Sequence, residues 1–171
     1  MPMHDNKESQ GDLGNGGGRK VLTFSLREEV YGVDILHVKE IRVWSPVTRI
    51  PQSASDVLGV LNLRGRVVPI IDLRVRFALG AAQFTAVTVI IVLSLDDGRT
   101  QHEAGIVVDE VRDVIDVADA SLKPVPSTGA IHAGAFIEGI ATSGEQMLIL
   151  LNAGKLLFDD MSSATPAGRA A

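Results

Sequence analysis

The chain has 171 residues, enough for one domain or two small ones, and 46% of them are apolar, so a sizeable core can form. Its net charge of -5 argues against broad nucleic-acid binding, which needs a basic face to neutralise phosphates. The sequence has no cysteine, which excludes disulfides, thiolate metal sites and a cysteine nucleophile.

The two ends of the chain carry little that could join a core. Residues 1–19 contain almost no apolar side chains and end in a glycine cluster, so we expect a disordered tail. They lack the apolar h-region of a secretory signal, and the longest apolar stretch, residues 86–93, is far shorter than the roughly 20 residues of a membrane helix. Residues 162–171 are predicted to form a second tail. We therefore expect a soluble, cytoplasmic protein that does not insert into the membrane directly.

Short strand patterns recur between the tails, built mainly from Val, Ile and Leu because aromatic residues make up only 4% of the chain. The predicted strands cover residues 21–26, 30–35, 38–43, 57–63, 67–71, 88–95, 105–108, 111–117 and 147–151. Residues 64–66 suit the tight turn of a hairpin. A short helix is expected over residues 73–79, capped by Asp72 and ended by Gly80. Strands this short and regularly spaced favour small barrels over a βαβ fold.

The two halves of the folded part resemble each other. Residues 32–41 align with residues 105–114, with glycine on glycine and acid on acid, and residues 59–73 align with residues 139–153. Each copy would hold about 70 residues, and a unit of that size buries too little of its surface to be stable alone. We therefore expect a duplicated β module whose two copies share an apolar core.

No residue cluster in the sequence indicates catalysis, a cofactor or a metal. The four histidines are scattered without metal-ligand spacing, so surface or structural roles are expected. Five carboxylates recur between residues 109 and 119, where a divalent-cation site is one interpretation and a solvated strand face that discourages edge pairing is the better one. Walker, G-x-G-x-x-G and G-x-S-x-G patterns are absent. We therefore predict a non-enzymatic protein.

The stretch NLRGR, residues 62–66, places an amide and two guanidinium groups where a hairpin needs only a turn. By composition alone these are turn residues. Arginine, however, can bind a partner carboxylate through two hydrogen bonds and is enriched at protein interfaces. With an exposed Leu63 as an apolar anchor, this turn would form a surface that another protein contacts.

The stretch from Arg49 to Arg74, RIPQSASDVLGVLNLRGRVVPIIDLR, resembles the signature of the CheW-type chemotaxis coupling proteins. The similarity extends through VYGVDILHVKEIR, GIVVDEVRDVIDV and MLILLNAGKLL, in the same order and spacing. It implies an all-β fold of two five-stranded SH3-like β-barrel subdomains that share an apolar core, with short helices. We place a CheW-like domain at residues 20–161, with subdomains at about 20–86 and about 87–161 and strands that can cross over between them.

The resemblance also implies a function. Such proteins are non-enzymatic adaptors that join the cytoplasmic tips of methyl-accepting chemoreceptors to the regulatory domain of the chemotaxis histidine kinase, and they support receptor-array assembly. A groove between the barrels receives the receptor's helical hairpin. The interaction residues implied for receptor or kinase are Val38, Glu40, Gly59, Asn62, Leu63, Arg64 and Gly65. Gly59 and Gly65 would act through backbone shape, and Arg64 would contact a partner acid.

Two alternatives to a chemotaxis coupler stay open. The scaffold could serve another chemosensory pathway, such as one that controls surface motility or development, or, less favoured, the chain could be a β-barrel that binds a small molecule. The chain departs from the usual family pattern at Ala54, where proline is common, at Asp56, where an apolar residue is common, and in a lengthened loop at residues 96–104. These departures concern affinity and partner choice and leave the signature intact.

Overall fold

The computed structural model describes residues 17–80, 83–126 and 134–163, the last five of these by their backbone alone. Within these ranges the strands are β1 (Gly18–Leu26), β2 (Glu29–Asp34), β3 (Val38–Val43), β4 (Val57–Leu63), β5 (Arg66–Asp72), β6 (Val89–Asp96), β7 (Gln101–Val108), β8 (Glu110–Ala118), β9 (Ile137–Ser143) and β10 (Gln146–Leu151). The α-helices are α1 (Leu73–Arg76) and α2 (Ala153–Ser163). The short 3₁₀ helices are η1 (Ile35–His37), η2 (Asp119–Ser121) and η3 (Gly134–Phe136).

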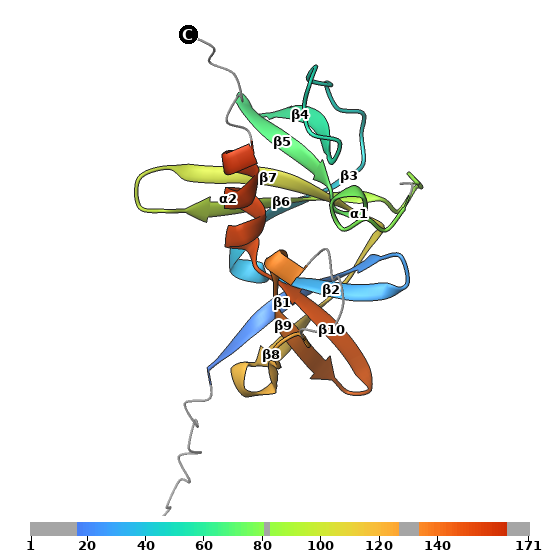
Figure 1. The fold of residues 1–171 in the computed structure, drawn as a ribbon, viewed down its shortest axis with the longest axis vertical. Helices are drawn as coiled ribbons and strands as arrows, with labels where there is room; N and C mark the ends of the chain where they lie inside the picture. Colours follow the sequence, from blue (N-terminus) through green and yellow to red (C-terminus); the bar gives the residue numbers. More distant parts are fainter. Residues whose placement is uncertain (1–16, 81–82, 127–133, 164–171) are drawn as a thin grey trace, which may run out of the picture.

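The strands form two five-stranded sheets, which lie one above the other in Figure 1. The strand order is β8-β1-β2-β10-β9 in the lower sheet, sheet A, and β3-β6-β7-β5-β4 in the upper sheet, sheet B. In each sheet a segment beyond one edge strand bridges to the other edge strand: Thr48 pairs with Val60 of β4, and Lys123 pairs with Ile140 of β9. Each sheet therefore curls toward a small barrel. The predicted all-β class, with two five-stranded units and short helices, is confirmed.

The sheets exchange strands between the two halves of the chain. β1 and β2 pair in sheet A with β8, β9 and β10, whereas β3 to β7 make up sheet B. This exchange follows the internal repeat, because β1 to β5 correspond in order to β6 to β10 and each sheet takes two strands from one copy and three from the other. The chain crosses between the sheets at η1 and again at Asp109. The sheets do not coincide with residues 20–86 and 87–161, and the subdomain boundaries stay a prediction.

A shared apolar core joins the sheets, whose strands do not pair with each other. It contains the buried side chains of Leu22, Phe24, Leu26, Tyr31, Val33, Ile71, Leu73, Phe77, Ile91, Leu93, Ile106, Val108, Phe136, Leu151, Leu156 and Leu157. Four of the chain's few aromatic rings run through this core, with successive centroids 6.2, 5.8 and 6.0 Å apart. Burial of one such large side chain contributes about 1.5–3 kcal/mol, so apolar packing holds the two sheets together.

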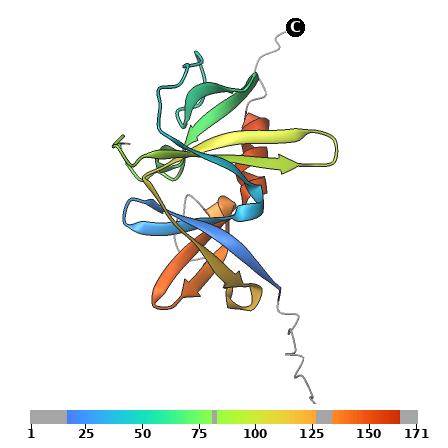
Figure 2. The same cartoon turned by 180° about the vertical axis from the view of Figure 1, so that it is seen from behind.

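The helices and the chain ends differ in detail from the prediction. Asp72 caps α1, its side chain accepting a hydrogen bond from the backbone N of Arg74 at 2.9 Å, but α1 already ends at Arg76. α2 lies against β6 and β7 of sheet B although it follows β10 of sheet A (Figures 1 and 2). β1 begins at Gly18 and α2 reaches Ser163, inside the ranges predicted as tails, and the rest of both tails lies outside the described residues. Where the chain is described, every helix is too short or too polar to cross a membrane.

Candidate functional site

The signature turn joins β4 and β5 through two residues. Leu63 pairs with Arg66, and Arg64 and Gly65 between them both have positive φ, 54° and 84°. Two successive positive φ values are what a type I′ hairpin turn requires, and they fit the twist of the flanking strands. The Asn62 Oδ1 accepts a hydrogen bond from the backbone N of Gly65 at 2.8 Å. The turn is therefore fixed by its own sequence, and Arg64 is exposed at its tip.

Gly59 acts on the backbone of β4. Its φ is 151°, and a Cβ at this position would overlap the carbonyl oxygen of Thr48. The backbone N of Val60 donates to that same oxygen at 2.8 Å, and the backbone N of Thr48 donates to the carbonyl of Val60 at 3.0 Å. Glycine therefore allows the segment after β3 to approach β4, which brings the two edges of sheet B together.

The predicted exposure of Leu63 is wrong. Leu63 is buried in the apolar cluster inside sheet B, together with Val68 and Ile70. In the hairpin the residue opposite Asn62 is Val67, which is 68% exposed. Because side chains alternate across a strand, Leu63 shares the inner face with the core while Asn62 and Val67 share the outer face. The apolar group that this hairpin presents to solvent is therefore Val67. The sequence signal was in β4, where the polar Asn62 between Leu61 and Leu63 marks the outer face.

Val38 and Glu40 lie on β3, at the opposite edge of the sheet B order from β4. Val38 is half-buried and packs against the shared core. The Glu40 carboxylate pairs with the Arg42 guanidinium of the same strand at 3.2 Å. The structure thus divides the predicted site residues into two groups: a β3 group of two residues, and the hairpin residues Gly59, Asn62, Leu63, Arg64 and Gly65.

A charged cluster that the sequence did not reveal lies between these two groups. Glu103 of β7 forms ion pairs with Lys39 of β3 and with Arg66 of β5, and its side chain is only 8% exposed. The Nη1 of Arg66 also donates to the Gln101 Oε1 at 3.4 Å. The sequence placed Glu103 in a lengthened loop, but β6 extends to Asp96 and β7 begins at Gln101, so that loop is short and Glu103 belongs to a strand.

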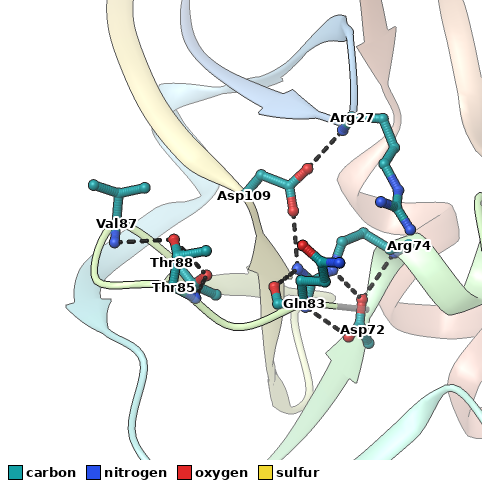
Figure 3. A network of polar contacts seen from close by, with 8 residues as sticks. All are labelled: Arg27, Asp72, Arg74, Gln83, Thr85, Val87, Thr88 and Asp109. Carbon is teal, nitrogen blue, oxygen red and sulfur yellow. Dashed lines mark hydrogen bonds and ion pairs between the residues drawn. The ribbon is translucent and has the colours of Figure 1, made fainter. Parts of the chain in front are cut away.

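A second polar network lies at the far end of β5 (Figure 3). The Arg74 guanidinium is buried and meets both Asp72 oxygens, at 3.0 Å from Nε and 3.0 Å from Nη2. Its Nη1 donates to the Asp109 Oδ1 at 2.9 Å and to the backbone carbonyl of Gln83. The Asp109 Oδ2 accepts from the backbone N of Arg27 at 2.6 Å, so the network reaches the β1–β2 turn of the other sheet.

The charges of this network are paired. Burial alone lowers the pKa of Arg74, but hydrogen bonds and charge from Asp72 and Asp109 raise that pKa above its ordinary value. The interpretation of residues 109–119 as a solvated strand face is therefore wrong for Asp109, whereas Glu110 and Asp113 are exposed as expected. Asp56, one of the departures from the family pattern, also has a partner, because its Oδ2 lies 2.6 Å from the Nε of Arg76.

The histidines show no common site. The His102 Nε2 lies 2.9 Å from the Asp97 Oδ2, His37 lies in η1, and the other two fall outside the described residues. No group of three or more potential metal ligands occurs among residues 17–80, 83–126 and 134–163. In these ranges the candidate site combines the exposed polar residues Asn62 and Arg64 with the buried Gly59 and Leu63 and the half-buried Val38 and Glu40.

Comparison with known proteins shows which family has this architecture. A family model described as CheW-like domain matches residues 20–160. The chain is similar to the chemotaxis protein CheW of Klebsiella aerogenes, with 44% identity over 140 residues that cover 82% of this chain and 82% of that protein. It is also similar to the probable chemotaxis protein CheW of Rhizobium etli, with 35% identity over 150 residues that cover 88% of this chain and 94% of that protein.

A solved structure agrees with these sequence matches. The crystal structure of scaffolding protein TtCheW from Thermoanaerobacter tengcongensis superposes on this fold with a TM-score of 0.71. The two chains are 36% identical, and the match covers 80% of this chain and 90% of that one. The signature turn, the two exchanged five-stranded sheets and the family match over residues 20–160 lead to one conclusion: the chain belongs to the CheW-like domain family.

Proposed function

We propose that this protein is a non-enzymatic, cytoplasmic chemotaxis adaptor. It couples the cytoplasmic tips of methyl-accepting chemoreceptors to the regulatory domain of the chemotaxis histidine kinase and supports assembly of the receptor array. The observation that carries the proposal is the NLRG turn, which a type I′ geometry fixes at the tip of β4 and β5 with Arg64 exposed. The relatives named as chemotaxis proteins and the neighbour named as a scaffolding protein support it.

The adaptor works by holding two macromolecules near each other and makes no covalent bond. Once it binds one partner, the second partner meets it at the effective concentration set by the assembly, so modest contacts combine into a stable array. If the adaptor binds the active and inactive arrangements of the kinase with different affinity, it shifts the population between them. This coupling requires a rigid scaffold, which the shared core of the two sheets supplies.

The interaction residues divide by role. Arg64 binds a partner carboxylate through its guanidinium, and Asn62 holds the turn in the shape that presents Arg64. Gly59 and Gly65 act through the backbone conformations that they permit. Val38 and Glu40 form the part of the interface that lies on β3. Leu63 acts from inside the sheet, as support for the turn.

Reconstitution of receptor, kinase and adaptor tests the proposal. We expect kinase activity to depend on the adaptor and Arg64→Glu to weaken coupling by about ten- to a hundredfold, because a hydrogen bond to a charged group contributes about 1.5–3 kcal/mol. The free energy of unfolding should change by no more than about 0.5 kcal/mol, since Arg64 is exposed. Arg99→Glu, the same charge change in the exposed turn after β6, is the matched control.

The same assay contains the outcomes that contradict the proposal. If the wild-type adaptor leaves kinase activity unchanged and binds neither partner, the proposed function is wrong. If Arg64→Glu unfolds the protein, Arg64 has a structural role instead. A kinase from another chemosensory pathway, added in a parallel reaction, tests the alternative that the scaffold serves surface motility or development.

A further inference from the structure

The Glu103 cluster consists of Lys39, Arg66, Ser94, Gln101 and Glu103, which come from four of the five strands of sheet B. Glu103 lies on β7, next to β5 in the sheet, and reaches Arg66 there. Lys39 reaches Glu103 from β3, across the intervening strand β6. The cluster is completed by Gln101, whose Nε2 donates to the Ser94 Oγ at 2.9 Å. It therefore links the strand that carries Val38 and Glu40 to the hairpin that carries the signature turn.

The burial of the three charged groups is unequal. Glu103 is almost fully covered, whereas the side chains of Arg66 and Lys39 are 47% and 35% exposed. A guanidinium carries five N–H donors and an ammonium carries three, so a single carboxylate leaves donors on both cations. Arg64, which follows Leu63 in the adjacent turn, adds a third exposed cation. Against the one carboxylate of Glu103, the cluster and the adjacent turn therefore carry three cations, Lys39, Arg66 and Arg64.

Fixing the side chains of Lys39 and Arg66 before binding reduces the entropy that is lost when a partner binds. Lys and Arg have large rotamer freedom, and a side chain that becomes ordered only in a complex weakens that complex. Because Glu103 holds Lys39 and Arg66 in the folded protein, part of this ordering occurs on folding. The arrangement suits a partner surface that carries exposed carboxylates, which pair with arginine through two parallel hydrogen bonds.

We propose that Glu103 is a positioning residue of the interaction surface: it holds Lys39 and Arg66 so that, together with Arg64, they present three cations to carboxylates of a partner protein. This inference rests on the proposed function, since it concerns the same interface. It adds the chemistry of the partner, which is an acidic surface. It also adds Glu103, a residue that acts on the interface although its own side chain is almost fully covered.

Glu103→Gln separates positioning from simple charge. The substitution keeps the size of the side chain and makes this end of the sheet more positive, so long-range attraction for an acidic partner would increase. The loss of the two ion pairs lowers the affinity, because Lys39 and Arg66 would then become ordered only on binding. We expect affinity to fall by about tenfold, through faster dissociation, which is the effect of ordering two more side chains in the complex.

The measurement is binding of the full-length chain to the kinase regulatory domain and, separately, to the receptor tip. Asp116→Asn is the matched control, because it removes one acid from an exposed ion pair with Lys20 in sheet A. Weaker binding in one arm supports the proposal and identifies which partner carries the carboxylates. Glu103→Gln that binds both partners as tightly as the wild type, or more tightly, overturns it.

Further variants keep the test decisive if Glu103→Gln folds poorly. Lys39→Met and Arg66→Met change exposed side chains, and each should weaken the same partner as Glu103→Gln. Combined with both methionine substitutions, Glu103→Gln should weaken binding no further, because Glu103 acts through these two cations. A full additional loss in that background contradicts the proposal. Failure of the wild-type chain to bind either partner would instead overturn the proposed function itself.

Discussion

The ends of β5 and β10 occupy equivalent places in the two copies of the repeat, yet they are held in different ways. After β5, the side chains of Asp72 and Arg74 form a buried ion pair that reaches Asp109 (Figure 3). After β10, the aligned residues are Asn152 and Gly154, and the Asn152 Oδ1 only accepts a hydrogen bond from the backbone N of Lys155 at 3.0 Å. The helix that follows has four residues after β5 and eleven after β10.

The two points where the chain crosses between the sheets show the same difference: an ion pair lies at one of them and a helix cap at the other. Asp109 at the second crossing is tied to Arg74 of α1, next to sheet B, and to the backbone N of Arg27 in the β1–β2 turn of sheet A. The aligned residue at the first crossing is Leu36, which is 84% exposed and contributes its backbone N to the Asp34 cap of η1. Charge therefore anchors the end of the strand that carries the signature turn, while the other copy depends on helix packing.

Removal of the Arg74 charge at the end of β5 should cause the largest fall in the free energy of unfolding. Arg74→Met leaves the buried Asp72 carboxylate without its partner, and the loss of one member of a buried ion pair costs about 3–5 kcal/mol. Urea unfolding at neutral pH measures this change. The double variant Asp72→Asn, Arg74→Met should recover part of the loss, because no buried charge then remains unpaired at the cap. A cost below about 1 kcal/mol for Arg74→Met would show that the network contributes little to stability.

The aligned glycines of β4 and β9 provide a second comparison. Gly59→Ala forces alanine into a positive φ, a strain of about 1–3 kcal/mol, and also places a Cβ against the Thr48 carbonyl. In Gly139→Ala the new Cβ would lie 2.8 Å from the Lys123 carbonyl oxygen, without a positive φ. We expect the first variant to lose more stability in urea than the second. Equal losses would show that the close approach, and not the backbone conformation, sets the requirement for glycine.

These differences explain which parts of the fold and of the candidate site the sequence could predict. Strand alternation, turn glycines and the repeat act locally, so the sheets, the hairpin at residues 64–65 and the Asp72 cap could be predicted. The strand position of Glu103 and the partner of Asp109 depend on which strands become neighbours. Because the repeats exchange strands, those neighbours come from distant parts of the chain, and no local pattern specifies them.

Loss of the helix cap after β10 should lower the free energy of unfolding less than loss of the ion pair after β5. Asn152→Ala removes the hydrogen bond to the Lys155 backbone N, and the loss of a helix cap typically costs about 1 kcal/mol. α2 should remain folded against β6 and β7, because Leu156 and Leu157 are buried in the shared core. Circular dichroism and urea unfolding of this variant, beside Arg74→Met, measure the difference between the two ends directly. A larger loss for Asn152→Ala than for Arg74→Met would reverse the comparison.

The smallest effect concerns the β6–β7 turn, where the Asp97 carboxylate contacts His102, much as the Asp109 carboxylate contacts the backbone N of Arg27 at the β1–β2 turn. A hydrogen bond from His102, helped by the backbone N–H groups of Thr100 and Arg99, lowers the pKa of Asp97 from 3.8 to about 2. Because the folded pKa lies below the unfolded one, this contribution to stability is complete above pH 3.8 and is lost as the pH falls to about 2.

His102→Gln should therefore raise the pKa of Asp97 toward its ordinary value, which a carboxyl-carbon NMR titration measures. The stability of this variant should fall less steeply than that of the wild type as the pH is lowered from 3.8 to about 2, because less of the Asp97 contribution remains to be lost. At neutral pH the variant should therefore be slightly less stable in urea than the wild type, and only slightly, since exposed ion pairs contribute little to stability. An unchanged pKa in His102→Gln would show that the backbone N–H groups of the turn lower it without help from His102.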